Sequence, residues 1–196
     1  MKSRYVLLLA FFLFKIQSIV AQHTFMEIGV GIGNVVGNKN ARGKGELHFN
    51  IIKPYKFGQL GLDVSTGGNF ILGTTPIVDE NMETLSSNDF KFSAITVLYR
   101  LPVKTYGFVE PRLGYSSLFT FVHTDDKTKI SQPNVTVGIG IGAHLNNFTL
   151  SLRYQHLGVT PNYIGTKNTI IVKSNSESLD LLLLRVSYRF NLKKSF

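Results

Sequence analysis

The stretch that decides the fold lies in the second half of the chain. Residues 135–155 read VTVGIGIGAHLNNFTLSLRYQ. On each side of Asn146 and Asn147, apolar residues alternate with small or polar residues at every second position. Alternation with period two is typical of a β-strand with two different faces, and a two-residue Asn turn joins antiparallel neighbours. The stretch therefore predicts a β-hairpin.

The same alternation recurs outward from this hairpin through the chain after residue 22, where helical spacing is not sustained. It predicts six further strands, of which residues 90–101 are the least regular. These strands are residues 24–37, 45–54, 59–71, 90–101, 108–122 and 178–192. Together with the hairpin they make eight strands.

The connections between the predicted strands alternate in length. Those near residues 55–58, 102–107 and 146–147 are short. Those near residues 38–45, 72–89, 123–134 and 159–177 are longer and polar. Transmembrane barrels of antiparallel strands have short turns at one end and long loops at the other. The sequence therefore predicts an all-β fold, an eight-stranded antiparallel up-and-down transmembrane β-barrel, with both termini at the short-turn end.

The polar face of the strands distinguishes a membrane barrel from a soluble lipocalin-like barrel, which shows the same period. This face is rich in Gly, Ser and Thr, whereas a water-exposed face carries many Lys and Glu. Its charges nearly balance, with four acids and five arginines: Glu27, Glu46, Asp63, Glu110, Arg100, Arg112, Arg153, Arg185 and Arg189. An unpaired buried charge costs several kcal/mol, so such a balance is typical of a closed interior. We therefore expect the polar face to point inward and the apolar face to meet lipid.

Aromatic residues gather beside the short turns, as in the interfacial girdles of membrane barrels. The predicted girdle consists of Tyr55, Phe57, Tyr99, Tyr106, Phe108, Phe148 and Phe190.

The start of the chain has the layout of a secretory signal peptide. Lys2 and Arg4 precede an apolar run over residues 5–14, and Ala21 offers a small residue at a cleavage point before Gln22. The run is shorter than the roughly 20 residues that a membrane-spanning helix needs. Residues 1–21 are therefore predicted to be removed, leaving residues 22–196 as one barrel domain.

Composition restricts the chemistry of the chain. The 196 residues include no cysteine, which excludes disulfides, thiolate metal sites, a cysteine nucleophile and a lipid-modified cysteine. The net charge of +9 falls to +6 when Lys2, Arg4 and Lys15 are removed, since 18 basic residues then face 12 acidic ones. These basic residues are spread over many segments, so no nucleic-acid partner is expected, and anionic lipid or polysaccharide is favoured.

Three segments carry a family resemblance. They are residues 106–115, YGFVEPRLGY, residues 137–142, VGIGIG, and residues 185–190, RVSYRF. With the signal peptide and the eight strands, they resemble the small outer-membrane β-barrel proteins of Gram-negative bacteria with an OmpA-like β-barrel domain. The resemblance implies location in the outer membrane and contact with its lipids and lipopolysaccharide. It also implies insertion by the barrel-assembly machinery, which reads a final aromatic residue. Either Phe190 or Phe196 fits that role, because Lys194 breaks the apolar register.

His156 is the most tempting catalytic candidate. It is loosely similar in position to the catalytic His of outer-membrane lipid A deacylases, in which a Ser and an Asn follow the His. Leu157, Gly158 and Val159 follow here, so a Ser-His mechanism lacks its nucleophile at that spacing. Glu110 and Arg112 are interpreted as part of a structural network. We therefore expect no catalytic residue and no enzyme activity.

Other motifs favour structural or solvent-exposed roles. Two series resemble fragments of a dinucleotide-binding loop, but no helix follows either, so we expect lumen glycines and no cofactor. These are Gly29, Gly31 and Gly33, and Gly138, Gly140 and Gly142. The acidic loop residues lack metal-ligand spacing, so no metal site is expected. They are Asp79, Glu80, Glu83, Asp125 and Asp126. A further hypothesis is that Lys39, Arg42 and Lys44 meet lipopolysaccharide phosphates.

The sequence thus predicts an integral outer-membrane barrel with a structural role or a loop-mediated role in binding or adhesion. Side chains can fill an eight-stranded barrel, so a general pore is not expected. Two alternatives stay open, a lipid-modifying barrel enzyme and a soluble periplasmic carrier. The sequence identifies neither a ligand nor an oligomeric state.

Overall fold

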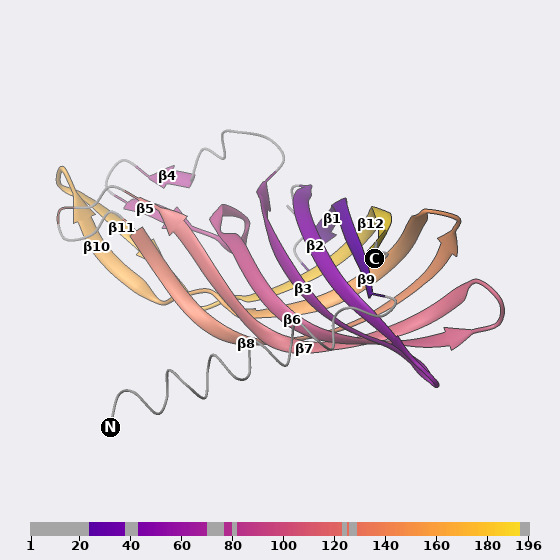
Figure 1. Ribbon diagram of the computed structural model, residues 1–196. Helices are drawn as coiled ribbons and strands as arrows, with labels where there is room; N and C mark the ends of the chain where they lie inside the picture. The colour runs from indigo at the N-terminus through magenta and orange to yellow at the C-terminus, as the bar shows by residue number, and fades with distance from the viewer. Residues whose placement is uncertain are drawn as a thin grey trace, which may run out of the picture.

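Eight long antiparallel strands close into a barrel in the computed structural model, which describes residues 24–37, 43–69, 77–79, 82–122, 125 and 129–192 (Figure 1). Each strand pairs with its neighbours along the chain, and the first strand pairs with the last to close the barrel. The barrel strands are β1 (Thr24–Val35), β2 (Lys44–Tyr55), β3 (Gly58–Asn69), β6 (Lys91–Val103), β7 (Gly107–Phe121), β8 (Lys129–Leu145), β9 (Phe148–Val159) and β12 (Ser178–Leu192). The predicted eight-stranded up-and-down barrel is confirmed.

The short connections lie together at one end of the barrel, here called the turn end. Asn146 adopts a positive φ of 55° in the β8–β9 turn and Lys104 one of 57° in the β6–β7 turn, which tight turns require of a central residue. Thr24 pairs with Leu192, so the start of β1 and the end of β12 also lie at the turn end. The opposite end carries the long connections and is called the loop end.

A second, four-stranded sheet forms at the loop end from two of the long connections (Figure 1). Its strands are β4 (Ile77–Asp79), β5 (Met82–Leu85), β10 (Tyr163–Lys167) and β11 (Ile170–Ser174), and a 3-10 turn η1 (Ser87–Asp89) follows β5. β5 and β11 pair in parallel and join segments that are distant in the chain. The sequence predicted these segments only as polar loops.

β8 is longer than predicted, because it begins at Lys129 and not near residue 135. Pro133 lies within this extension. The ladder between β8 and β9 ends at the pair Val137 and His156, so Pro133 lies where β8 has lost one neighbour, and an edge position tolerates proline. Beyond the ladder, the Asn134 side chain accepts from the Val159 amide and donates to its carbonyl, both at 3.1 Å.

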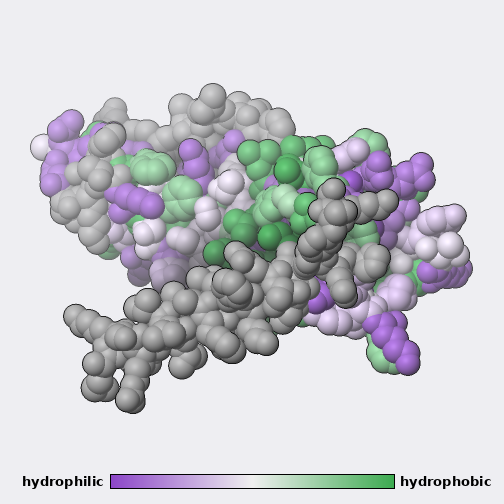
Figure 2. Space-filling model, in the orientation of Figure 1, coloured by the Kyte–Doolittle hydropathy of each residue, from purple (hydrophilic) through white to green (hydrophobic). Residues whose placement is uncertain are grey.

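The outer wall of the barrel is apolar over its middle. Figure 2 shows hydrophobic residues gathered there, with hydrophilic residues toward both ends. Ile28, Val30, Val135 and Ile139 are each more than half exposed on this wall. The nine charged residues that the sequence predicted inside point inward, whereas a soluble carrier turns its charged residues toward water. A closed barrel with this wall suits lipid, since every strand has two hydrogen-bonded neighbours.

Among the described residues, the helical structure consists of the 3-10 turn η1. Among the residues described, no helix is long and apolar enough to cross a membrane. The predicted signal peptide, residues 1–21, lies outside the described residues, as does Phe196.

Candidate functional site

The turn-end half of the lumen holds a network of arginines and carboxylates. Its first centre is Glu27 on β1, which is fully buried. Arg100 donates from both terminal nitrogens to its two oxygens at 2.8 Å, and Arg189 donates to Oε1 at 2.9 Å. Thr149 and Asn50 add hydrogen bonds of 3.0 and 3.1 Å. One carboxylate thus contacts side chains from four other strands.

The second centre of the network is formed by Asp63 and Glu46. Arg185 bridges the two, donating to Asp63 Oδ2 at 3.1 Å and to Glu46 Oε2 at 2.9 Å. Arg112 lies 3.1 Å from Asp63 Oδ1, and Arg153 contacts both carboxylates. The whole set is buried, and burial requires that its charges be paired in this way.

Glu110 joins the two centres, because its oxygens accept from Arg100 Nε at 2.5 Å and from Arg112 Nε at 2.6 Å. All nine charged residues that the sequence predicted inside therefore lie in one connected network. The interpretation of Glu110 and Arg112 as structural is consistent with this geometry.

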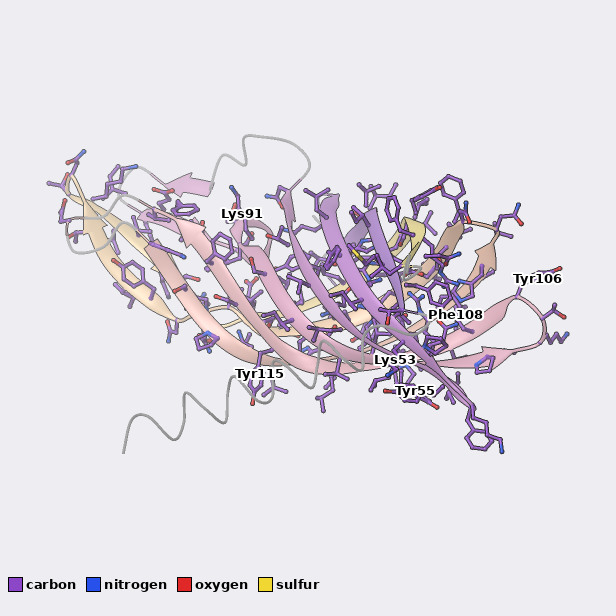
Figure 3. All side chains as sticks on the ribbon, viewed as in Figure 1. Lys53, Tyr55, Lys91, Tyr106, Phe108 and Tyr115 are labelled. Carbon is purple, nitrogen blue, oxygen red and sulfur yellow. The ribbon has the colours of Figure 1, made fainter. Side chains whose placement is uncertain are left out.

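Phe108 was assigned wrongly to the aromatic girdle. It is 3% exposed, stacks on His144 with ring centroids 4.7 Å apart, and lies under the Arg100 guanidinium at 4.6 Å. Its even number places it on the face of Glu110 and Arg112, a signal that the sequence contained. In Figure 3, Phe108 lies among the barrel strands, whereas Tyr106 lies farther out, beside the turn at the turn end.

The other girdle residues follow the prediction. They lie outside the barrel and are exposed or half-buried: Tyr55, Phe57, Tyr99, Tyr106, Phe148 and Phe190.

Lys44 does not reach the membrane surface, so its predicted contact with lipopolysaccharide is wrong. It is fully buried at the start of β2, where Nζ donates to Asn69 Oδ1 at 2.5 Å and to the Phe90 carbonyl at 3.3 Å. Its burial follows from parity, since it lies two residues before Glu46 on the inner face of β2. Lys39 and Arg42 lie outside the described residues.

The two glycine series line the crowded lumen, as predicted. A Cβ on Gly31 would lie 2.9 Å from Glu46 Oε2, and a Cβ on Gly142 would lie 2.4 Å from the Phe108 ring. Gly142 therefore has no space for a side chain, and a side chain at Gly31 would have to displace Glu46.

The loop-end half of the lumen holds a hydrophobic core. Its members come from the barrel and from the second sheet: Val35, Leu85, Phe90, Phe92, Ala94, Leu118, Val122, Ile130, Leu157, Tyr163, Val172, Leu179, Leu181 and Leu183. Because Leu85, Tyr163 and Val172 belong to β5, β10 and β11, the second sheet packs onto the core and covers it.

The outer face of the second sheet is partly apolar. Ile164 is 67% exposed, and Ile171 and Met82, which are register partners on β11 and β5, are also exposed. Thr166 on β10 pairs with Ile171 and accepts at its carbonyl from the Asp125 amide at 2.8 Å. Exposed apolar side chains on neighbouring strands in water are a typical feature of interaction surfaces.

The acidic loop residues do not form a metal centre in the described part of the chain. Within that part, no group of three or more His, Asp or Glu side chains is placed to hold a metal ion. Glu83 lies on β5 and Asp125 next to β10, while Glu80 and Asp126 lie outside the described residues. Asp79 is described by its backbone on β4.

His156 lies on the outer wall near the loop end, with polar partners that the sequence analysis missed. Its Nδ1 lies 2.8 Å from Asp180 Oδ1 and 3.5 Å from the Ser178 hydroxyl, which donates to Asp180 Oδ2. Tyr154 donates to Asp180 Oδ1 at 3.0 Å. Both new partners come from β12, because Asp180 pairs with His156 across the ladder. A search downstream in the same strand could not find them.

This cluster lacks the geometry of a Ser-His-Asp relay. A relay places the carboxylate on one ring nitrogen and the nucleophilic hydroxyl on the other. Here Asp180 and Ser178 share the Nδ1 side of His156, and the hydroxyl donates to the carboxylate. The arrangement therefore orders the side chains but does not activate Ser178.

Comparisons with known proteins identify the fold. No protein-family model and no curated protein matches the sequence. Among solved structures, Ail, the attachment invasion locus protein of Yersinia pestis, is similar with a TM-score of 0.53 and 13% identity, covering 87% of this chain and 99% of that one. Neisserial surface protein A is similar with a TM-score of 0.52 and 14% identity, covering 85% of this chain and 97% of that one. The N-terminal β-barrel domain of Pseudomonas aeruginosa OprF is similar with a TM-score of 0.50 and 9% identity, covering 86% of this chain and 100% of that one.

At these identities the likeness shows the fold alone. The closed eight-stranded fold and the lipid-type wall together define the class of the chain, an integral β-barrel of an outer membrane.

Proposed function

We propose that the chain is a Gram-negative outer-membrane barrel with a structural role or a role in binding and adhesion through its loops, and not a general pore. The observation that carries this proposal is the filled lumen. Arginines and carboxylates occupy its turn-end half, and the hydrophobic core under the second sheet occupies its loop-end half. Side chains leave an eight-stranded barrel little open space.

The second sheet supports a binding role at the cell surface. It presents Met82, Ile164 and Ile171 to water beyond the membrane, on a frame that is packed on the core of the barrel. The similar protein Ail carries attachment and invasion in its name, and one of its structures holds the heparin analogue sucrose octasulfate (TM-score 0.51, 12% identity). These properties belong to Ail, and they suggest attachment as the activity to test here.

Attachment of bacteria that display the protein tests the loop-mediated role. A host strain expressing the chain should attach to cultured cells more than the empty strain does. The triple variant Met82→Ser, Ile164→Ser and Ile171→Ser should lose most of this gain, because it removes the exposed apolar contacts. The variant must show the same heat-modifiable gel migration as the parent, which reports the folded barrel. Unchanged attachment by a folded variant would contradict the binding role.

Conductance across a planar lipid bilayer tests the absence of a general pore. The purified barrel should give no sustained open-channel current, because charged and apolar side chains fill both halves of the lumen. A steady current proportional to voltage would overturn this part of the proposal.

We also propose that the chain is not an enzyme, since the Ser178 hydroxyl is not placed on the free nitrogen of His156. The alternative is a lipid-modifying barrel enzyme. Lipid A acylation in cells expressing the parent should equal that in cells expressing His156→Ala. A change in acyl-chain number that depends on His156 would establish the enzyme alternative.

A further inference from the structure

Two lysines and two phenylalanines form a cluster on the outer wall at the loop end, here called the rim cluster. Lys91 begins β6, Phe119 and Phe121 end β7, and Lys129 begins β8. Lys91 pairs with Phe119 and Phe121 pairs with Lys129, so the four residues are cross-strand neighbours. Figure 3 shows Lys91 toward the loop end, far from Tyr106 at the turn end.

Both ammonium groups of the rim cluster lie near one aromatic ring. Lys91 Nζ is 5.8 Å and Lys129 Nζ is 5.9 Å from the centroid of Phe121, and Lys129 Nζ is 4.9 Å from that of Phe119. Phe119 and Phe121 pack edge to face at 5.8 Å. These distances are typical of cation–π contacts, which place each lysine over the aromatic platform.

The rim cluster carries two like charges, one on Lys91 and one on Lys129. Within the part of the chain that the structure describes, neither ammonium has a carboxylate at salt-bridge distance, although every arginine of the lumen has one. Two cations held beside one ring repel each other, and an anion between them would relieve that repulsion. The cluster is thus suited to a negatively charged ligand.

The height of the rim cluster points to the lipid headgroups. From Gly107 to Ser117, a strand tilted by about 40° rises about 25 Å, which is the height of the lipid-facing band of an outer-membrane barrel. Hydroxyl side chains replace aliphatic ones at the end of this band, where Thr66 and Ser93 lie 3.2 Å apart. Phe119 and Phe121 lie beyond Ser117, so the cluster is level with the phosphates of the outer leaflet.

The part of the rim formed by β9 and β12, next to β8, has a different charge. There Asp180 contacts His156, Tyr154 and Ser178 on the outer wall of β9 and β12. A carboxylate disfavours an anionic ligand. The described rim therefore favours an anion on the side formed by β6, β7 and β8.

We propose that the rim cluster binds the phosphate of a phosphorylated lipid in the outer leaflet. The phosphate lies between the Lys91 and Lys129 ammonium groups over the Phe121 edge, and the acyl chains follow the apolar wall toward Tyr115 and Val135. This site is separate from the loop surface proposed for attachment and does not depend on it.

Lipid retention in native mass spectrometry from detergent micelles tests the proposal. The probes are diphosphoryl lipid A and the same lipid with its phosphates removed. Each lysine near an anionic lipid contributes about fivefold to binding, so Lys91→Gln with Lys129→Gln should reduce the preference for the phosphorylated probe about thirtyfold. The matched control is Lys53→Gln with Lys56→Gln, which removes two cations that lie over Tyr55 and Phe57 at the turn end. The control should keep the preference of the parent.

Three results would overturn the proposal. The first is an unchanged preference in a folded double variant, judged by heat-modifiable migration. The second is an equal loss in the control, which would show only a general effect of charge. The third is displacement of the lipid by inorganic phosphate at the same concentration, which would assign the site to free anions. If the double variant does not fold, Lys129→Gln alone should lose about fivefold. The Met82, Ile164 and Ile171 triple variant should keep lipid retention whether or not it loses attachment.

Discussion

Between the turn end and the loop end, the same eight strands enclose two different interiors. Toward the turn end, carboxylates such as Glu27 and Asp63 each accept from arginines on several strands. Toward the loop end, Leu118, Leu181 and Val172 belong to a hydrophobic core that holds the second sheet. Hydrogen-bonded ions require defined partners, whereas apolar contacts tolerate rearrangement. The comparison suggests that the ionic half specifies strand register and the apolar half anchors the loops.

The largest expected effect comes from breaking the ionic half at Asp63. Asp63→Asn keeps the shape of the side chain and removes the charge that faces Arg112, Arg153 and Arg185. Leaving buried arginines uncompensated should lower the free energy of unfolding by about 3–5 kcal/mol. Urea titration in lipid vesicles, read by heat-modifiable migration, measures the change. A shift below about 1 kcal/mol would show that the network contributes little to stability.

A smaller effect is expected from opening the apolar half. Leu181→Ala removes a fully buried side chain of the core and should lower the free energy of unfolding by about 3 kcal/mol. Because the core also supports the second sheet, limited proteolysis should cut the 160–177 connection faster in this variant than in Asp63→Asn. Equal cleavage in the two variants would contradict the assignment of loop anchoring to the apolar half.

A local effect is expected where β9 leaves the barrel for the loops. Gly158 has a φ of 104°, and a Cβ there would lie 2.2 Å from the Asn134 Cβ. Gly158→Ala should therefore cost about 2 kcal/mol through backbone strain and displacement of the Asn134 amide. Asn134→Ala is the control, because it removes the neighbour but keeps the glycine. If Gly158→Ala lowers the free energy of unfolding no more than Asn134→Ala does, the strain is absent.

The barrel could be predicted from the sequence because the alternation of apolar and polar residues within each strand shows which residues share a face. Alternation placed all nine lumen charges correctly, and the same parity would have placed Phe108 and Lys44 inside. The second sheet could not be predicted in this way. Its strands are three to five residues long, and the pairing of β5 with β11 joins distant segments whose contact depends on the closed barrel. The neighbours of His156 were missed for the same reason, because Ser178 and Asp180 reach it across a ladder.

The smallest expected effect separates the buried network from the rim cluster. Raising the ionic strength from about 0.1 to 1 M shortens the Debye length from about 10 to 3 Å, which screens exposed charges far more than buried ones. The difference in unfolding free energy between the parent and Asp63→Asn should therefore change by less than about 0.5 kcal/mol, because Asp63 and its arginines are buried. Retention of phosphorylated lipid, which depends on the exposed Lys91 and Lys129, should fall over the same range. If salt reduced the Asp63 effect as strongly as lipid retention, water and ions would have to enter the turn-end half, and the contrast between a sealed ionic interior and an open cationic rim would fail.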